Sequence, residues 1–190
     1  MKYILYAKHW QIFLLAFLLP CLLISGGFFY FKIFSNLDVL FYMIPTGIVI
    51  LQVSVYQWLW SVGTNLSKHV ENEKVNASLF KTLIIIPVVI LVLVLMFWLI
   101  LSLKMSISGM YSLGGILISS LIFILPIQCF FSIIAIYCFY FVARIIKQCE
   151  TQQKMEFENF FKEFVFVILL PIGIWFLQPK INEIISLSHK

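Results

Sequence analysis

The sequence has few charged residues, and it has none in the middle of its long apolar stretches. Charged residues make up 11% of the 190 residues, whereas a soluble domain has roughly 25%. All eight acidic residues and all three histidines lie at the ends of the apolar stretches or between them. With 63% hydrophobic residues, this composition excludes an ordinary soluble domain and indicates a membrane protein.

The missing intramembrane charges also bear on chemistry. Ion-coupled transporters and proton relays usually hold ionisable groups at depth, so coupled transport is disfavoured, although backbone carbonyls and hydroxyls alone can bind sodium. Membrane proteases and metalloenzymes need converging His, Asp or Cys side chains. We therefore expect no enzymatic activity, no cofactor and no metal site.

Cysteine and net charge add two further exclusions. Cys129 and Cys138 are nine residues apart with no His or carboxylate near them, which is no metal-ligand spacing, and no disulfide framework is implied. The net charge of +5 comes from residues between the apolar stretches and at the chain ends. That placement is typical of a membrane orientation signal, so we expect no nucleic-acid partner.

Five long apolar stretches make up most of the chain. A membrane-spanning helix needs about 20 apolar residues, which the first four stretches provide. We predict an all-α membrane protein with a single bundle over residues 1–190, in which five transmembrane helices each contain a proline. The predicted spans are approximately 10–34, 39–60, 83–103, 115–142 and 160–178, with Pro20, Pro45, Pro87, Pro126 and Pro171 inside them.

The fifth stretch is the shortest. Between Glu163 and Pro179 lie 15 residues, about 22 Å of helix against roughly 30 Å of hydrocarbon. Snorkelling of Lys162 could extend it into a full crossing. A re-entrant segment is the alternative, and it would bring the C-terminus back to the side from which the segment enters.

Lysine and arginine positions predict the orientation. With the N-terminus in the cytoplasm, nine basic residues fall in inside segments and four in outside segments. The positive-inside rule therefore predicts an N-in/C-out topology.

Polar side chains within the spans occur in the second and fourth spans. Those singled out are Gln52, Ser54, Gln57, Gln128 and Ser132. Gln128 and Ser132 are four apart and share a helix face. Hydrogen bonds between helices are the favoured role, and a polar substrate pocket is the alternative.

The five prolines could act as helix hinges of a transporter, but static kinks are favoured because no intramembrane charge accompanies them.

Residues 45–87 and 126–171 have a similar order of features: a proline, a segment of lysines and a glutamate, a Phe-Lys pair and a second proline. Corresponding residues are 79 to 84 positions apart in the sequence. A duplicated hairpin and a chance match both explain this similarity.

Three segments resemble known sequences: YAKHWQ at 6–11, WLWSVG at 58–63 and LPIGIWFLQPKIN at 170–182. They are similar to segments of small, functionally uncharacterised multi-pass inner-membrane proteins of Gram-negative bacteria. The resemblance implies a bacterial inner (plasma) membrane and assigns no activity.

The expected function is therefore non-enzymatic. An accessory or structural subunit of a membrane assembly is the leading hypothesis, because the short outer connections suit a protein that packs sideways. A small transporter or flippase-like carrier of an apolar or amphipathic molecule is the alternative. The expected partners are the lipid bilayer and other membrane subunits or further copies of this chain.

Overall fold

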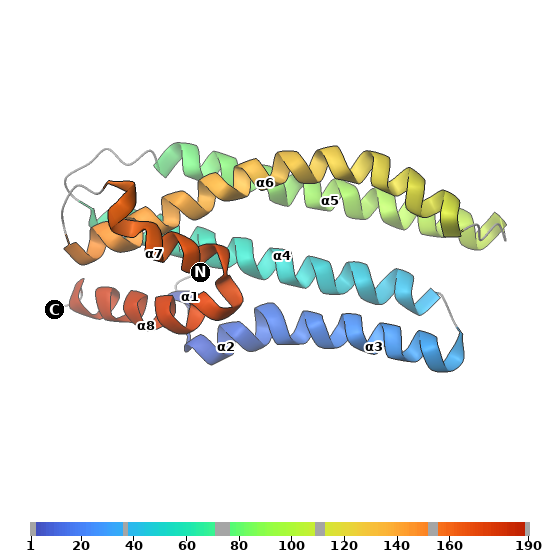
Figure 1. Cartoon of the computed structure of the whole chain (residues 1–190), viewed down its shortest axis with the longest axis horizontal. Helices are drawn as coiled ribbons and strands as arrows, with labels where there is room; N and C mark the ends of the chain where they lie inside the picture. Colours follow the sequence, from blue (N-terminus) through green and yellow to red (C-terminus); the bar gives the residue numbers. More distant parts are fainter. Residues whose placement is uncertain (1–2, 36–37, 71–76, 109–112, 152–155, 189–190) are drawn as a thin grey trace.

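The computed structural model describes residues 3–35, 38–70, 77–108, 113–151 and 156–188, and these are almost entirely helical (Figure 1). The elements are α1 (Tyr3–Tyr6), α2 (His9–Phe13), a π-helical turn (Leu14–Leu18), α3 (Leu19–Phe34), α4 (Asp38–Leu66), a 3-10 turn (Ser67–His69), α5 (Ala77–Ser108), α6 (Leu113–Thr151), α7 (Phe157–Ile168) and α8 (Leu170–Ser188). No strand occurs in the described ranges.

Four segments are long and apolar enough to cross a membrane: His9–Phe34, Tyr42–His69, Ala77–Val94 and Phe130–Thr151. Each overlaps one of the first four predicted spans. The prediction of an all-α protein with apolar, membrane-type helices is therefore confirmed. The helices continue past the predicted spans: α6 has 39 residues, about 58 Å, or nearly twice the roughly 30 Å hydrocarbon core.

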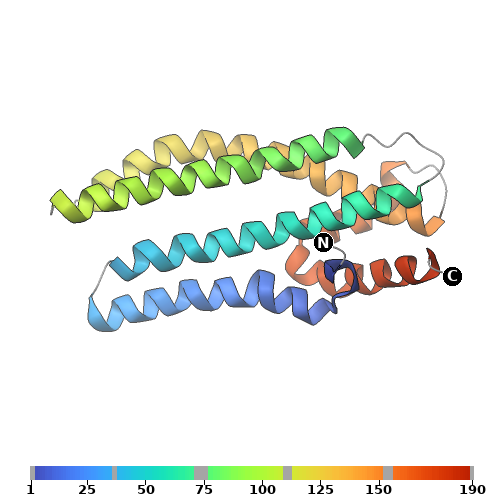
Figure 2. The same cartoon turned by 180° about the vertical axis from the view of Figure 1, so that it is seen from behind.

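The long helices form two antiparallel pairs, α3 with α4 and α5 with α6, which both views show side by side (Figures 1 and 2). Helix α3 ends at Phe34. The next residue, Ser35, has a left-handed backbone with φ of 51°, and its N–H donates to the Phe31 carbonyl at 2.8 Å. This is a common helix C-terminal arrangement, and it lets the chain reverse into α4.

The prolines have different local consequences. Pro20 follows the π-helical turn, in which the Leu19 N–H donates to the Leu14 carbonyl five residues earlier. Pro45 and Pro87 lie inside the continuous helices α4 and α5. Pro171 is the second residue of α8, where its missing N–H has no intrahelical partner to lose. Pro126 falls within the bounds of α6, but its side chain lies outside the described residues.

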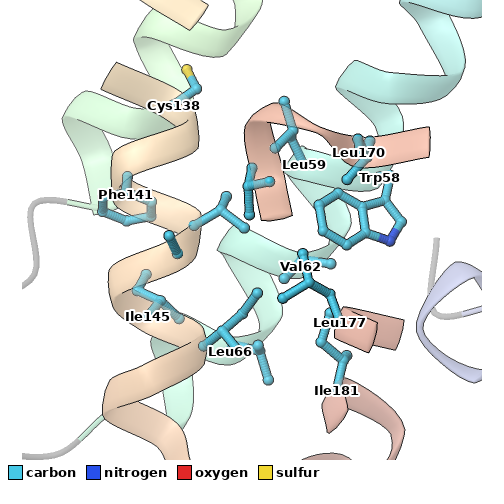
Figure 3. Packing of buried hydrophobic residues seen from close by; sticks show 14 of the residues in the cluster. Trp58, Leu59, Val62, Leu66, Cys138, Phe141, Ile145, Leu170, Leu177 and Ile181 are labelled. Atoms are coloured by element: carbon cyan, nitrogen blue, oxygen red, sulfur yellow. The ribbon is translucent and has the colours of Figure 1, made fainter. Parts of the chain in front are cut away.

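The buried core lies at one end of the bundle, where α4 and α6 end and α5 begins; we call this the packed end (Figure 3). Trp58, Leu59 and Val62 of α4 face residues of α6 and α8 there, and all three are fully buried. From α5, the Phe80 ring stacks on Phe141 with centroids 4.3 Å apart. Gly63 permits this, because a Cβ atom at that position would overlap the Phe80 ring.

The predicted fifth span, residues 160–178, is not a continuous helix. Helix α7 ends at Ile168, Leu169 leaves the helical conformation with φ of −89° and ψ of 46°, and α8 begins at Leu170. The chain then doubles back, so that Lys180 Nζ lies 2.7 Å from Glu163 Oε1. A straight helix would separate residues 17 apart by about 25 Å. The prediction of a single continuous fifth helix is therefore wrong, because the chain folds back on itself at Leu169.

Local sequence explains the turn at Leu169. The Leu169 carbonyl accepts the Gly173 N–H at 2.7 Å and so starts the new helix, with Pro171 in its first turn. Gly173 then packs directly on the α7 backbone, because a Cβ atom there would overlap the Phe166 carbonyl oxygen. A proline at the helix start and a glycine at the helix contact together make the tight α7–α8 hairpin possible.

The α7–α8 hairpin places α8 at the same end of the bundle as the N-terminal segment. Lys180 of α8 lies 2.7 Å from Glu150 near the end of α6, and Gln178 bonds to the first residues of the chain. The N-terminal segment and α8 therefore lie together at the packed end, as both views show (Figures 1 and 2). This differs from the N-in/C-out prediction, which requires the two ends on opposite sides, because that prediction assumed a fifth crossing.

A topology measurement tests this arrangement. Reporters inserted between α4 and α5 and fused after α8 should report the same side of the membrane, because both positions lie at the packed end. A reporter inserted between α3 and α4 should report the opposite side and serves as the control. Opposite sides for the first two reporters would restore the full fifth crossing.

Candidate functional site

The polar residues predicted within the spans do not converge on one pocket. Gln52, Ser54 and Gln57 are all half-buried on α4. Ser132 is exposed on α6, and the side chain of Gln128 lies outside the described residues. The expected hydrogen bonds from Gln128 and Ser132 to neighbouring helices therefore stay a prediction.

Two open grooves lie on either side of α4. The α2–α4 groove has a volume of about 200 Å³ and is lined by Ser54, Gln57 and Gln11 among mostly apolar residues. The larger α4–α5 groove has a volume of about 470 Å³. Its lining is Val53, Tyr56, Gln57, Trp60, Ile84, Ile85 and Val88. Gln57 contributes to both grooves, whereas Gln52 lines neither.

A buried amide that the sequence did not single out joins three segments of the packed end. Gln178 of α8 is fully buried, and its Oε1 accepts a hydrogen bond from Trp58 Nε1 of α4 at 2.9 Å. Its Nε2 donates to the carbonyls of Ile4 at 3.1 Å and Ala7 at 3.2 Å, and to Asn182 Oδ1 at 3.1 Å. Gln178 therefore ties α8 both to α4 and to the start of the chain.

The same face of α8 contains the signal that could have revealed this amide. Ile174, Gln178 and Ile181 follow one another at helical spacing, and all three are fully buried. An amide on the apolar face of an amphipathic helix needs hydrogen-bond partners inside the protein. Gln178 is the last residue of the predicted fifth span, 160–178. Because this span was expected to cross the membrane as a single helix, the periodicity was not recognised.

Four charged side chains form an ion cluster that joins α6, α7 and α8. Lys180 contacts Glu163 and Glu150, each at 2.7 Å, while Lys147 contacts Glu150 at 2.8 Å and Glu163 at 3.8 Å. The cluster is electrically balanced, with two ammonium groups and two carboxylates. Glu163 is the most buried member, with a side chain only 8% exposed. The cluster therefore fastens the hairpin to the end of α6.

Electrostatics favour the charged state of Lys180. Burial alone would lower the pKa of this ammonium, but hydrogen bonds from it to Glu150 and Glu163 raise the pKa above its ordinary value overall. A group whose pKa is higher in the folded than in the unfolded protein stabilises the fold, and this contribution is fully present at pH values below the pKa of the unfolded state. That contribution is lost only as the pH rises through the folded pKa. The Lys180 contribution is therefore present at neutral pH and is lost under alkaline conditions. Burial would raise the pKa of Glu150, but hydrogen bonds from the two lysines lower this pKa overall, so the carboxylate contribution is lost as the pH falls through that lowered pKa.

The position of Glu163 was also recognisable in principle. Phe160, Glu163 and Val167 recur at helical spacing and form the buried face of α7. Tyr140 of α6 packs on this helix, with its ring 5.2 Å from Phe160 and 6.5 Å from Phe164. An acid on such an apolar face needs a cation beside it, and the fold-back supplies Lys180.

Gln178 and the ion cluster hold the helices of the packed end together. Gln178 and the ion cluster have protein partners from neighbouring helices, and neither lines the two grooves. Within the described ranges, no three His, Cys, Asp or Glu side chains gather as a metal site would require. Comparison with protein-family models, curated proteins and solved structures found no match for this chain. The resemblance to small membrane proteins of Gram-negative bacteria therefore stays a prediction.

A double-mutant cycle tests the Gln178 contacts. Trp58→Phe removes the indole N–H while keeping an aromatic ring, and it should lower the free energy of unfolding by about 1–2 kcal/mol. In the Gln178→Leu background the same change should cost less, because the acceptor is already gone and only the packing loss from the smaller ring remains. Unfolding of the purified protein in detergent measures both values, with Gln52→Leu as a control. Additive losses would show that the two side chains do not interact.

A matched pair of carboxylates on α7 tests the ion cluster. Glu163→Gln removes the buried charge facing Lys180, and it should lower the free energy of unfolding by about 1–3 kcal/mol. Glu158→Gln changes an exposed carboxylate on the same helix, and its effect should stay within about 0.5 kcal/mol. Thermal unfolding in detergent compares the two variants. Equal effects would mean that the cluster adds no stability.

Proposed function

We propose that the chain is a non-enzymatic multi-pass membrane protein that acts as an accessory or structural subunit of a membrane assembly. The supporting observation is how its polar groups are used. Gln178 and the ion cluster tie its own helices together at the packed end, and the two grooves are lined mainly by apolar residues. What such a molecule offers to a partner is chiefly the apolar sides of its long helices.

Those sides are extensive. On α3, Phe28, Phe29 and Phe34 are more than half exposed, and on α5 the same holds for Leu93 and Met96. Helix α5 has no polar stripe along its membrane segment, which is typical of a helix surrounded by lipid or by other membrane helices. In a membrane, neighbouring helices associate through such surfaces by close packing. This arrangement suits a subunit that binds sideways.

The proposed orientation has the packed end in the cytoplasm of a bacterial cell, at the inner membrane. The basic residues of the described ranges toward this end are Lys8, Lys68, Lys81, Arg144, Lys147, Lys162 and Lys180, whereas Lys32 of α3 and Lys104 of α5 lie toward the opposite end. The fold-back adds Lys180 to the basic end, which strengthens the charge asymmetry used by the positive-inside rule. The proposal includes four crossings and a re-entrant α7–α8 hairpin.

The hairpin suits partial insertion. Helix α7 has 12 residues, about 18 Å, which is too short to cross roughly 30 Å of hydrocarbon. The residues around its turn are apolar and exposed, including Leu169, Ile172 and Phe176. An apolar tip with a charged base is favoured at a membrane surface, because the tip can enter the hydrocarbon while the base stays in the headgroup region.

Affinity purification tests the subunit proposal. A tagged chain extracted in a gentle detergent should bring down at least one other membrane protein in fixed stoichiometry. A sample of the tagged chain that is denatured before capture controls for binding to unfolded chains, because it should recover no partner in fixed stoichiometry. Recovery of the folded chain without a stoichiometric partner would contradict the proposal.

One observation supports the alternative function, a small carrier of an apolar or amphipathic molecule. Pro87 lies between Ile85 and Val88 on α5, directly beside the α4–α5 groove, and Pro45 lies in the facing helix α4. Both helices are continuous, but each proline removes a backbone hydrogen bond, and such positions can permit helices beside a transport path to rearrange.

Proline replacement separates the two functions. For a subunit, we expect Pro45→Ala and Pro87→Ala to leave thermal stability, partner recovery and the phenotype of a complemented deletion strain close to normal. A carrier whose helices must rearrange would instead give folded but inactive variants. That second result, together with normal thermal unfolding of both variants, would favour the carrier over the subunit.

A further inference from the structure

The α4–α5 groove has the size and lining of a binding site for an apolar chain. Its volume of about 470 Å³ lies within the range of roughly 300–1,000 Å³ that ligand sites occupy. Ile84 forms its buried floor, while Val53, Ile85 and Val88 form an exposed rim. The groove is therefore open toward the outside of the bundle.

The surroundings of the groove decide what can enter it. Both walls belong to segments apolar enough to cross a membrane, Tyr42–His69 and Ala77–Val94. A groove on the outer face of two such helices opens into hydrocarbon, where the available occupant is a lipid acyl chain. Trp60 lies at the end of the groove toward the packed end, and tryptophan is enriched at the level of lipid headgroups.

The charges beyond this end of the groove select a headgroup. Lys81 lies four residues before Ile85 on α5, about 6 Å along the axis and on the same face. Lys68 lies eight residues, or about two turns, beyond Trp60 on the chain of α4. Both lysines are exposed, and residues 60–70 and 77–88 include no acidic side chain; the sequence between these two ranges contains Glu71, Glu73 and Lys74. Basic side chains above an apolar groove between membrane helices attract anionic lipid headgroups.

We propose that the α4–α5 groove binds one acyl chain of an anionic glycerophospholipid, whose phosphate is bound by Lys68 and Lys81. The stems of both lysines can lie along the apolar groove while their ammonium groups reach the headgroup level. Gln57 and Tyr56 line the same groove, so their polar atoms are available to the glycerol ester region. The inference holds for a subunit and for a carrier, and it needs only that α4 and α5 lie in a bilayer.

Lipid binding to the purified protein tests the proposal. Native mass spectrometry after titration with phosphatidylglycerol or phosphatidylcholine of identical acyl chains counts the bound lipids. The folded protein should retain one phosphatidylglycerol with roughly tenfold or greater preference over phosphatidylcholine. Glycerol phosphate, which has no acyl chain, should not compete. Equal binding of the two lipids, or competition by glycerol phosphate alone, would overturn the proposal.

Variants locate the site. The double variant Lys68→Gln, Lys81→Gln should lose the preference for phosphatidylglycerol, whereas Lys32→Gln, at the opposite end of α3, should keep it. Ile85→Trp fills the groove from its exposed rim and should abolish the retained lipid, and Val88→Trp provides a second blocking variant. Circular dichroism verifies that each variant is folded. Retention of the preference in the double lysine variant, or of the lipid in folded blocking variants, would place the lipid elsewhere.

Discussion

The buried side-chain amide of Gln178 is the interaction on which the arrangement of the last two helices depends. A fully buried amide needs partners for both its N–H donors and its oxygen. Here they come from Trp58 of α4, from the Ile4 and Ala7 carbonyls and from Asn182. No helix that continues outward from Glu163 could place Gln178 beside all of these segments. The requirement is met only because the chain turns at Leu169 and brings α8 back along α7, beside the N-terminal segment and Trp58 of α4.

Several features of the molecule follow from this turn. Lys180 reaches Glu163 and Glu150, which joins the hairpin to the end of α6. The core gains Leu177 and Ile181, so the packed end contains more helices than the opposite end (Figures 1 and 3). The buried polar groups of the packed end, Gln178 and Glu163, are thereby committed to internal contacts, whereas Lys68 and Lys81 stay exposed. What remains for partners is the apolar outer surface and the groove between α4 and α5, on which the functional proposals rest.

Sequence alone predicted the elements whose structure depends on local composition. The first four spans could be recognised because a stretch of about 20 apolar residues is the length that a helix needs to cross a bilayer. The prolines show where such reasoning ends: Pro45 and Pro87 stay inside helices, whereas Pro171 begins one, because Leu169 leaves the helix before it and Gly173 packs on Phe166. The repeat hypothesis does not predict this difference, since it pairs Pro87 with Pro171. The contacts of Gln178 with Trp58, Ala7 and Ile4 were missed because these partners are 120 to 174 residues away along the chain.

The central claim is the fold-back of α8 on α7, and the pair Phe166 and Phe176 measures it most directly. Their rings stack with centroids 4.9 Å apart, whereas ten residues of continuous helix would separate them by about 15 Å. Cysteines at these two positions, in a chain otherwise free of cysteine, should form an intramolecular disulfide when membranes are oxidised. The control pair at Phe166 and Phe161 should not close. Efficient expression without any Phe166–Phe176 cross-link would contradict the hairpin and restore a continuous fifth helix.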